Sequence, residues 1–453
     1  MDVLIDRLTA LLGDKAVSLG ADIAQPRHGR PLAVLRPKST SEVSAILRIC
    51  HEARQAVVPW GGLTGLVGGT KADDAIALSL ERMNRIESID TDSATMTVEA
   101  GCILQNVCEA ADKAGLFFPL DLGARGSATI GGNIATNAGG NRVLRFGMMR
   151  ELVLGLEVVL ADGTVLSSLN TLIKNNAGYD LKQLFIGSEG TLGVVTRAVL
   201  RLRPKLTSQN VAFLAVDSFE QITPILRRLD KNLSGDLSAF EVMWADFYQL
   251  VTTPPARGRP PISHGHPYYI LVETLGGDQD DDTVRFERAL AAELESGAVA
   301  DAVVAKSKAE CDRLWALRDD VGQVGRHAPI FTFDVSLRQR DMESYVTEVR
   351  TALLLSWPAP ALLVFGHLGD GNLHLIVGVG DGSIRTRRVV EAIVYDALRK
   401  RGGSVSAEHG IGLEKLNYLS YSRNPTEIAL MGALKRALDP YGILNPGKII
   451  ASR

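Results

Sequence analysis

Two histidines, His367 and His374, lie on either side of an Asp370-Gly371 dipeptide in the segment 364–377. Asp-Gly between two apolar runs is typical of a two-residue β-hairpin turn. A turn at these residues pairs His367 with His374 and places both imidazoles on one face, with Cβ atoms about 5 Å apart. Two imidazoles in this arrangement could bind one metal ion.

A third ligand could come from the segment 404–412, in which Glu408 and His409 are adjacent. On an extended chain, adjacent side chains point to opposite faces, so one could bind a metal while the other acts on a substrate. Two stacked core histidines and a surface glutamate are the alternative interpretation. A His/His/Glu set would also suit a hydrolytic zinc ion or a non-haem iron.

Two glycine-rich segments, 59–69 and 126–140, indicate a site for a phosphate-containing ligand. Glycine lets backbone N–H groups turn toward an anion without interference from Cβ, and such N–H groups can bind a pyrophosphate. Neither segment is a GxGxxG or a GxxxxGK[ST] motif, so neither a Rossmann fold nor a P-loop is indicated. Ligand-free tight turns are the alternative, which two such segments in one chain disfavour.

The elements around these motifs indicate an α+β protein. Up to residue 205, the pattern predicts a helix over 41–52 and strands at 57–59, 152–160 and 193–202. Beyond residue 205, strand-like runs at 211–216 and 268–274 alternate with amphipathic helices, a pattern that allows an antiparallel sheet. These helices are predicted over 219–230, 282–295 and 342–355, and a surface loop is predicted over 252–267.

The composition is that of a globular chain of two or three domains, with 453 residues of which 46% are hydrophobic and 22% charged. A net charge of −3 gives no basic field for nucleic acid or anionic lipid. The four cysteines show no CxxC spacing, and no apolar run is long enough to span a bilayer. We therefore expect a cytoplasmic protein with reduced cysteines, no transmembrane segment and no nucleic-acid partner.

The segments 59–69, 126–140 and 185–194 (Phe-Ile-Gly-Ser-Glu-Gly-Thr-Leu-Gly-Val) together resemble the FAD domain of the vanillyl-alcohol oxidase / p-cresol methylhydroxylase superfamily. The resemblance covers nearly the whole chain. It implies a two-subdomain FAD-binding domain of the p-cresol methylhydroxylase type over 1–205. An α+β substrate domain with an antiparallel sheet follows over 206–425, and a C-terminal segment, 426–453, returns to the flavin.

In that superfamily the first segment binds the FAD pyrophosphate, the second surrounds the ribityl and isoalloxazine groups, and the third borders the adenine. Leu63 stands where some relatives attach FAD through a histidine, and the second segment has no cysteine, so non-covalent FAD is implied. The implied FAD-binding residues are Pro59, Gly61, Gly62, Leu63, Thr64, Gly65, Leu66, Pro119, Gly126, Ser127, Thr129, Gly131, Gly132, Asn133, Thr136, Asn137, Gly139, Gly140, Glu189, Gly190, Gly193, Val194 and Asn445.

The histidine segments resemble the D-2-hydroxyglutarate dehydrogenase / D-lactate dehydrogenase branch of the superfamily. This implies that His367, His374 and Glu408 hold a divalent metal, expected to be zinc, and that His409 is the general base. Arg318 matches the catalytic arginine that binds the substrate carboxylate. Without the resemblance, Arg318 would be interpreted as a solvated helix charge or as a partner of Asp319 or Asp320. The flavin segments argue against the hydrolase and iron interpretations.

The chain departs from this branch at residues that would line the substrate site. Thr332, Gly322 and Ile376 stand where hydroxyglutarate dehydrogenases carry Lys, Thr and Asn, and Trp60 stands where relatives often have a polar residue. A second substrate carboxylate would therefore lose its partners. We expect Arg318, Thr332, Ile376 and His409 to bind the substrate, which would be D-lactate or another D-2-hydroxy acid with an uncharged side chain.

Two alternatives remain open for the function. One is a D-2-hydroxyglutarate dehydrogenase. The other is a metal-dependent hydrolase without flavin, whose glycine loops bind a phosphorylated substrate. The expected partner is a small 2-hydroxy acid, and the resemblance suggests an electron-transfer flavoprotein or a quinone as electron acceptor. A homodimer is compatible with the sequence, which does not itself reveal the oligomeric state.

Overall fold

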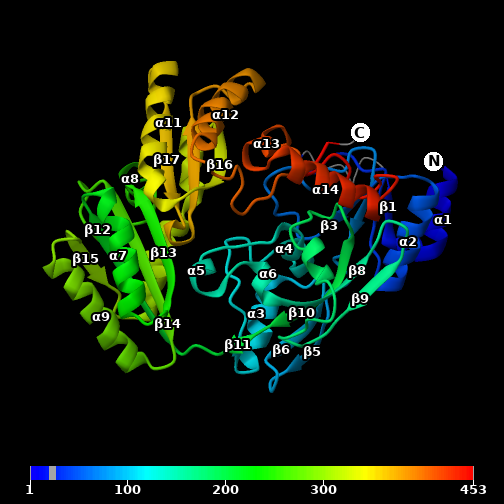
Figure 1. Ribbon diagram of the computed structural model, residues 1–453, viewed down its shortest axis with the longest axis horizontal. Helices are drawn as coiled ribbons and strands as arrows, with labels where there is room; N and C mark the ends of the chain where they lie inside the picture. The colour runs from blue at the N-terminus through cyan, green and yellow to red at the C-terminus, as the bar shows by residue number, and fades with distance from the viewer. Residues whose placement is uncertain (1, 20–26, 452–453) are drawn as a thin grey trace. The chain divides into compact units, whose positions relative to one another are not determined.

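The computed structural model describes residues 2–19 and 27–451, which group into two compact units (Figure 1). The first unit comprises Met1–Gly140, Gly147–Lys205 and Glu408–Arg453, and the second comprises Asn141–Phe146 and Leu206–Ala407. Contacts therefore assign the chain after Ala407 to the first unit. The expected domain limits at 205 and 425 stay a prediction.

The first unit contains two main sheets, as expected for two subdomains. A four-stranded sheet has the order β1-β2-β4-β3, with parallel pairs β2–β4 and β3–β4. A five-stranded antiparallel sheet has the order β5-β6-β10-β8-β9. The strands are β1 (Val17–Leu19), β2 (Ala33–Leu35), β3 (Val57–Trp60), β4 (Ile76–Ser79), β5 (Ile86–Asp90), β6 (Thr95–Glu99), β8 (Val153–Val159), β9 (Val165–Ser168) and β10 (Val194–Arg201), with a small pair of β7 (Leu116–Phe117) and β11 (Arg203–Pro204).

Helices of the first unit pack on these sheets, whose buried apolar side chains form a large cluster and a smaller one around Val58 and Trp60. They are α1 (Asp2–Leu12), α2 (Thr40–Glu52), α3 (Leu104–Lys113), α4 (Ile130–Thr136), α6 (Met149–Leu152), α13 (Leu419–Ser422) and α14 (Pro425–Leu438). The predicted helix over 41–52 is confirmed as α2, and its N-cap is Ser39, whose hydroxyl accepts from the Glu42 N–H. The C-terminal segment pairs with β3, because Val57 and Leu444 form a parallel bridge.

The second unit is built on a seven-stranded antiparallel sheet of order β15-β12-β14-β13-β17-β18-β16. The antiparallel sheet and the α+β class expected from the sequence are thus confirmed. The strands are β12 (Ser208–Val216), β13 (Leu237–Trp244), β14 (Tyr268–Gly276), β15 (Asp301–Val304), β16 (Ile330–Ser336), β17 (Ala361–Gly366) and β18 (Asn372–Gly378).

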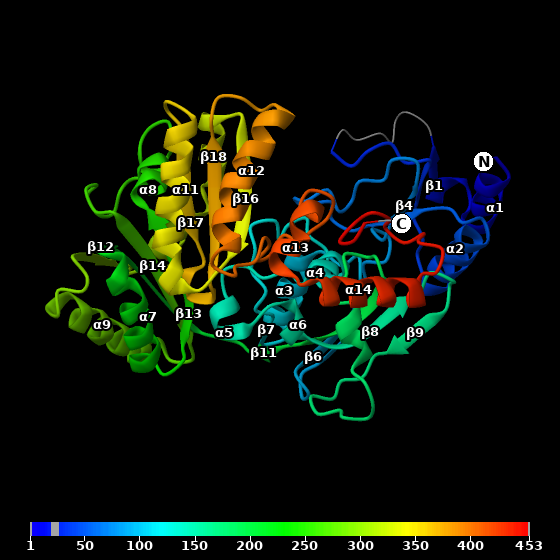
Figure 2. The ribbon, with the colours of Figure 1, turned by 45° about the horizontal axis from the view of Figure 1, so that its top comes forward.

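Helices cover both faces of this sheet. Figure 2 shows α11 and α12 beside the strands β16, β17 and β18, while α7 and α9 accompany β12, β13 and β14. Side chains of α8 and α10 join the opposite face in a single apolar cluster. The helices are α5 (Val143–Phe146), α7 (Phe219–Asn232), α8 (Ala245–Thr252), α9 (Gln279–Glu295), α10 (Lys308–Asp319), α11 (Met342–Ser356) and α12 (Ile384–Arg399).

Successive residues of a strand point to opposite faces, so the register decides which side chains meet. The face that α8 and α10 cover collects Phe213 of β12, Leu271 of β14, Met243 of β13, Phe365 of β17 and Ile376 of β18. We call it the α8/α10 face. Polar side chains of this face form the candidate site. Among the described residues, no helix is long and apolar enough to cross a membrane.

Candidate functional site

The two glycine segments of the first unit lie against each other. An added Cβ on Gly62 would overlap the Ser127 carbonyl oxygen, and one on Gly61 would meet the Thr129 hydroxyl. Only residues without a side chain allow the segments to approach this closely. Gly65, in contrast, faces open space. The sequence predicted both segments but not their mutual contact.

The second segment is not a continuous loop, as the sequence pattern suggested, because residues Ile130–Thr136 form α4. The Thr129 hydroxyl caps this helix by accepting a hydrogen bond from the Gly132 N–H at 3.4 Å. Gly131 lets the first turn pack closely on Ala100 of the sheet region. The helix thus fixes where the predicted FAD-binding residues of this segment lie.

Two buried amide groups of the first unit have atoms without a protein partner among the described residues. They are Asn133 Nδ2 and Asn445 Oδ1, on side chains that are 5% and 2% exposed. Buried polar atoms almost always find a partner, so an orphaned one indicates a ligand or a water. Both residues belong to the set expected to bind FAD. The close glycine packing and these orphaned amides fit a bound dinucleotide.

Glu189 ties the C-terminal segment to the same region of the first unit. Its carboxylate accepts hydrogen bonds from the Ile411 N–H at 2.7 Å and the Gly412 N–H at 2.9 Å. Burial raises the pKa of Glu189, against these hydrogen bonds, which lower it. Asn445 Nδ2 donates to the carbonyl oxygens of Gly69 (3.0 Å) and Glu189 (2.7 Å).

In the second unit, the predicted hairpin register is wrong by two residues. His374 pairs with Phe365 rather than with His367, because a 3-10 turn over Leu368–Asp370 and a left-handed Gly371 occupy the connection. A shift of two residues keeps every side chain on its face. The imidazole centroids of His367 and His374 are therefore still only 5.4 Å apart.

A buried carboxylate, Glu241 of β13, lies between His367 and Arg318. Its Oε1 is 2.7 Å from His367 Nδ1, and its Oε2 accepts from Arg318 Nε at 2.7 Å. Arg318 Nη2 is 3.3 Å from His367 Nε2, and all three residues are at most 5% exposed. Burial raises the pKa of Glu241, but the electrostatic and hydrogen-bond contacts with His367 and Arg318 outweigh burial and hold it well below its usual range.

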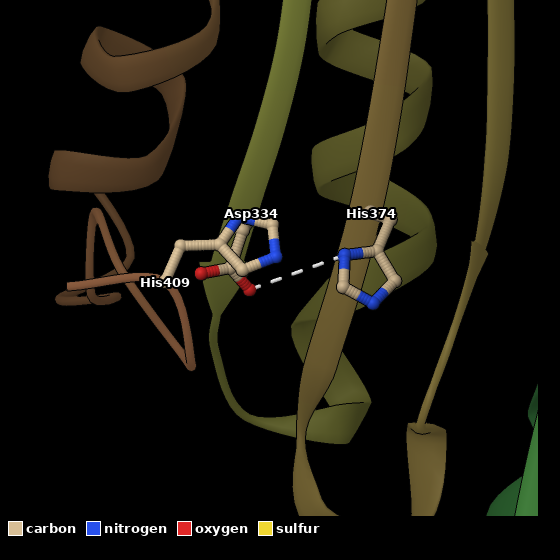
Figure 3. Close-up of side chains that lie close together, drawn as sticks. All are labelled: Asp334, His374 and His409. Atoms are coloured by element: carbon tan, nitrogen blue, oxygen red, sulfur yellow. Dashed lines mark ion pairs between the residues drawn. The ribbon is translucent and has the colours of Figure 1, made fainter. Parts of the chain in front are cut away.

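Asp334 of β16 is a second fully buried carboxylate, close to His374 of β18. Asp334 Oδ1 is 4.0 Å from His374 Nδ1 (Figure 3) and 2.9 Å from the Asn372 amide nitrogen that donates to it. Its Oδ2 accepts from the Ala407 N–H at 3.2 Å and is 3.4 Å from the Ser406 hydroxyl. Asp334 therefore holds the end of the second unit, residues 406–407, beside the strand that carries His374.

Glu408 and His409 directly follow this anchored segment and open the last part of the first unit. The extended conformation assumed for Glu408 and His409 is wrong, since the chain bends here and Gly410 adopts φ +85°. Within the first unit, the Gly140 N–H donates to Glu408 Oε1 at 2.6 Å. The roles of Glu408 as a metal ligand and of His409 as the general base stay predictions.

Of the expected substrate-binding residues, Thr332 and Ile376 lie on the sheet of the second unit, whereas Arg318 lies on α10 and His409 belongs to the first unit. Thr332 pairs directly with Ile376 across β16 and β18, and Ile376 belongs to the apolar cluster of the α8/α10 face. Thr332 is exposed, and a Cβ added to Gly322 would meet nothing within 4 Å. Ile376 shares its face with His374, as strand alternation predicted.

The sequence interpretation missed Glu241 and gave no role to Asp334. Both are single carboxylates within otherwise apolar strand sequences, Leu-Ser-Ala-Phe-Glu-Val-Met-Trp and Ile-Phe-Thr-Phe-Asp-Val-Ser. A buried carboxylate is rare unless it is paired, so this pattern could have indicated them. Their partners, however, come from distant parts of the chain.

Comparisons with known proteins agree with this arrangement. The family model described as "FAD linked oxidases, C-terminal domain" matches residues 205–449, and the one described as "FAD binding domain" matches residues 31–168. The structure resembles that of p-cresol methylhydroxylase with a TM-score of 0.79, 17% sequence identity and coverage of 99% of this chain and 97% of that chain. The expected FAD-binding fold of the p-cresol methylhydroxylase type is confirmed.

Relatives with higher identity are known. An Arabidopsis thaliana protein named "D-2-hydroxyglutarate dehydrogenase, mitochondrial" is 42% identical over 450 residues, which cover 97% of this chain and 80% of that protein. A Xanthomonas citri protein named "D-2-hydroxyglutarate dehydrogenase" is 41% identical over 437 residues, or 95% of this chain and 91% of that protein. The Arabidopsis protein is named as mitochondrial, so its name does not support the expected cytoplasmic location.

The fold and the two glycine segments define a flavoprotein oxidoreductase that binds FAD. More particularly, the chain belongs to the family of FAD linked oxidases. This membership confirms the predicted cofactor, although the residues that contact it stay predictions.

The close packing of the two glycine segments gives a first prediction. Gly62→Ala should separate them, because the new methyl group would overlap the Ser127 carbonyl. We expect a clear loss of bound FAD, measured as flavin absorbance per protein, and a lower Tm. Gly277→Ala is the control, since Gly277 lies in the second unit, outside the expected FAD-binding set, and its methyl group meets nothing within 4 Å. Equal FAD content in the two variants would contradict the proposed role of the contact.

Proposed function

We propose that this protein is an FAD-dependent dehydrogenase that oxidises a D-2-hydroxy acid to the corresponding 2-oxo acid. The observation that supports it best is the buried group of Arg318, Glu241 and His367, with His374 on the same sheet face. An arginine beside a pair of imidazoles suits a substrate that carries a carboxylate next to a hydroxyl. Membership of an FAD-linked family supplies the electron acceptor for that hydroxyl carbon.

In the proposed site, His367, His374 and Glu408 hold a divalent metal, for which zinc is the expected ion. These side chains are of the types that could hold a metal ion. Because His367 Nδ1 contacts Glu241, Nε2 is left as the atom that can bind the metal. Glu408 is one residue beyond Ala407, which hydrogen-bonds Asp334, so the covalent chain keeps it close to the strand pair of His374. When bound, the metal would act as a Lewis acid toward the substrate hydroxyl.

His409 is proposed as the general base. It follows Glu408 directly, and histidine titrates near neutral pH. In the reaction, His409 would take the hydroxyl proton while the C2–H bond breaks, and Arg318 would hold the carboxylate. FAD, when bound, supplies the acceptor of the hydride, so one hydroxyl becomes one carbonyl as the flavin gains two electrons. Leu63 in place of an attachment histidine supports non-covalent FAD.

The substrate side chain is proposed to be uncharged. Ile376, beside His374, is buried in an apolar cluster with Leu363 and Val324. Two other cations, Lys306 and Arg326, could pair with a second carboxylate if they reached the site. Lys306 follows the opposite edge strand β15 and pairs with Glu287. Four strands separate β15 from β18, a span of about 24 Å. Arg326 donates to the Thr253 carbonyl.

D-2-hydroxyglutarate is the alternative substrate, favoured by the names of the relatives at 41–42% identity. The electron acceptor is proposed to be an electron-transfer flavoprotein or a quinone, on the resemblance alone. An artificial dye acceptor would allow activity to be measured without knowing the natural electron acceptor. The cytoplasmic location and the homodimer also stay predictions.

The metal assignment predicts the behaviour of His367→Ala and His374→Ala. Each variant should lose bound metal and turnover but keep FAD, because both histidines lie in the second unit while the glycine segments lie in the first. Metal content by elemental analysis, flavin absorbance and dye-linked turnover would be measured together. Wild-type metal content with wild-type turnover in either variant would exclude the assignment.

The base assignment predicts that His409→Asn keeps bound metal and FAD but lowers kcat by about 100-fold or more. Asparagine preserves polarity and approximate size yet cannot take the proton. If kcat at saturating D-2-hydroxy acid equals that of the wild type, another group is the base.

The apolar surroundings of Ile376 predict a higher kcat/KM for D-lactate or longer aliphatic D-2-hydroxy acids than for D-2-hydroxyglutarate. A missing charge-assisted contact costs about 1.5–3 kcal/mol, or about ten- to over a hundredfold. Thr332→Lys with Ile376→Asn should raise kcat/KM for D-2-hydroxyglutarate, whereas Thr332→Met with Ile376→Asn, of similar size but uncharged at 332, should not. A wild-type preference for the dicarboxylate would instead support the alternative substrate.

A further inference from the structure

Glu241 touches both kinds of group that the proposed reaction needs in the second unit. One carboxylate oxygen contacts the imidazole of His367, and the other accepts from the guanidinium of Arg318, each at 2.7 Å. The side chain of Glu241 is 1% exposed, so water does not substitute for either contact. No other described carboxylate contacts both residues within hydrogen-bond distance.

The sheet register explains why Glu241 meets His367. β13 and β17 pair at Val242–Gly366 and Met243–Phe365. Continuing this antiparallel register by one residue places His367 opposite Glu241, on the same face. Beyond that point the chain leaves the sheet in the 3-10 turn of residues 368–370. The contact is therefore fixed by the backbone pairing and not by a flexible side chain alone.

The Glu241 contact determines which ring nitrogen of His367 faces the site. A carboxylate beside Nδ1 accepts a hydrogen bond from it, so Nδ1 carries the hydrogen and Nε2 has the lone pair. Nε2 is on the side of Arg318, whose Nη2 is 3.3 Å away. The same carboxylate thus sets the ligand atom of His367 and the position of the guanidinium next to it.

Arg318 is also held by an aromatic ring. Its guanidinium carbon is 4.9 Å from the ring centroid of Phe365. The Phe365 ring also contacts the rings of His374 at 5.1 Å and Phe247 at 4.1 Å. A guanidinium over an aromatic face is stabilised but can still slide across it. The hydrogen bond to Glu241 removes this freedom, because it fixes Nε.

We infer that Glu241 is a positioning residue that couples the metal ligand His367 to the substrate-binding Arg318. The inference rests on the proposed function. Glu241 itself touches neither metal nor substrate in this arrangement. It holds both groups in place, so that a 2-hydroxy acid could present its hydroxyl to the metal on His367 and its carboxylate to Arg318.

A matched control is present on the neighbouring strand β14. Glu273 is also fully buried on the α8/α10 face, and its carboxylate is hydrogen-bonded to Arg142 (3.1 Å), Ser238 (2.8 Å) and Trp315 (3.0 Å). Its hydrogen-bond partners include neither His367 nor Arg318. Neutralising Glu273 therefore tests the general cost of losing a buried charge on this face.

The experiment compares Glu241→Gln with Glu273→Gln in the full-length flavoprotein. Glutamine has the shape of glutamate, but its amide has only one acceptor oxygen. His367 Nδ1 and Arg318 Nε each need an acceptor, so one of them would lose its partner. Zinc affinity, measured by competition with a chromogenic chelator, should fall by about 10–100-fold in Glu241→Gln. KM for the preferred D-2-hydroxy acid should also rise. Glu273→Gln should keep zinc affinity and KM within about twofold, even where its Tm falls.

Glu241→Asp provides the second variant if Glu241→Gln does not fold. Aspartate keeps the charge that buried Arg318 requires, but it is one methylene shorter and cannot reach both partners. Zinc affinity in Glu241→Asp should again fall, with bound FAD unchanged. Wild-type zinc affinity in the folded Glu241 variants, or an equal loss in Glu273→Gln, would overturn the positioning role.

The wild-type protein separates this inference from the proposed function. If the wild type binds no zinc and oxidises no D-2-hydroxy acid, the proposed function fails, and the role of Glu241 fails with it. If the wild type binds zinc and turns over while Glu241→Gln matches it in zinc affinity and KM, only the role of Glu241 fails.

Discussion

A charge in a protein interior costs several kcal/mol unless it is paired and hydrogen-bonded. The α8/α10 face of the second unit contains three fully buried carboxylates, Glu241, Glu273 and Asp334. Each is satisfied only where specific donors converge, and α10 supplies donors to two of them through Trp315 and Arg318. The positions of α10 and of the strands are thereby tied to one another. Disturbing one carboxylate leaves a buried cation or N–H without its partner, so these groups specify the site more strictly than apolar packing could.

Strand alternation places these polar side chains and apolar ones on the same face of the sheet. On β18, His374 and Ile376 share one face, and β16 and β17 contribute Asp334 and Phe365 beside them. Polar side chains and an apolar cluster can therefore lie on one sheet surface, two residues apart along a strand. The face is preserved by any even shift in register. This is why His367 and His374 remain close although their connection is longer than a two-residue turn.

In the first unit, backbone segments that are expected to bind FAD lie very close together. Here the constraint is steric rather than electrostatic, since Gly61 and Gly62 contact the segment around Ser127 where a side chain would not fit. The C-terminal segment joins the same region through Asn445 and Glu189. The chain then links the two chemistries covalently, because Asp334 anchors Ala407, and Glu408 and His409 follow within two residues.

The sequence alone determined the α+β class, the FAD-linked family and the local elements, because periodicity, glycine runs and the histidine motif depend on neighbouring residues. It also placed His367, His374 and Ile376 on one face, since strand parity needs no knowledge of the partner strand. The tertiary structure decided the hairpin register, the helix at Ile130–Thr136 and the contact of the glycine segments. It alone assigned partners to Glu241, which is 77 residues from Arg318 and 126 from His367. A buried carboxylate requires a partner, but nothing local in the chain states which distant residue will provide it.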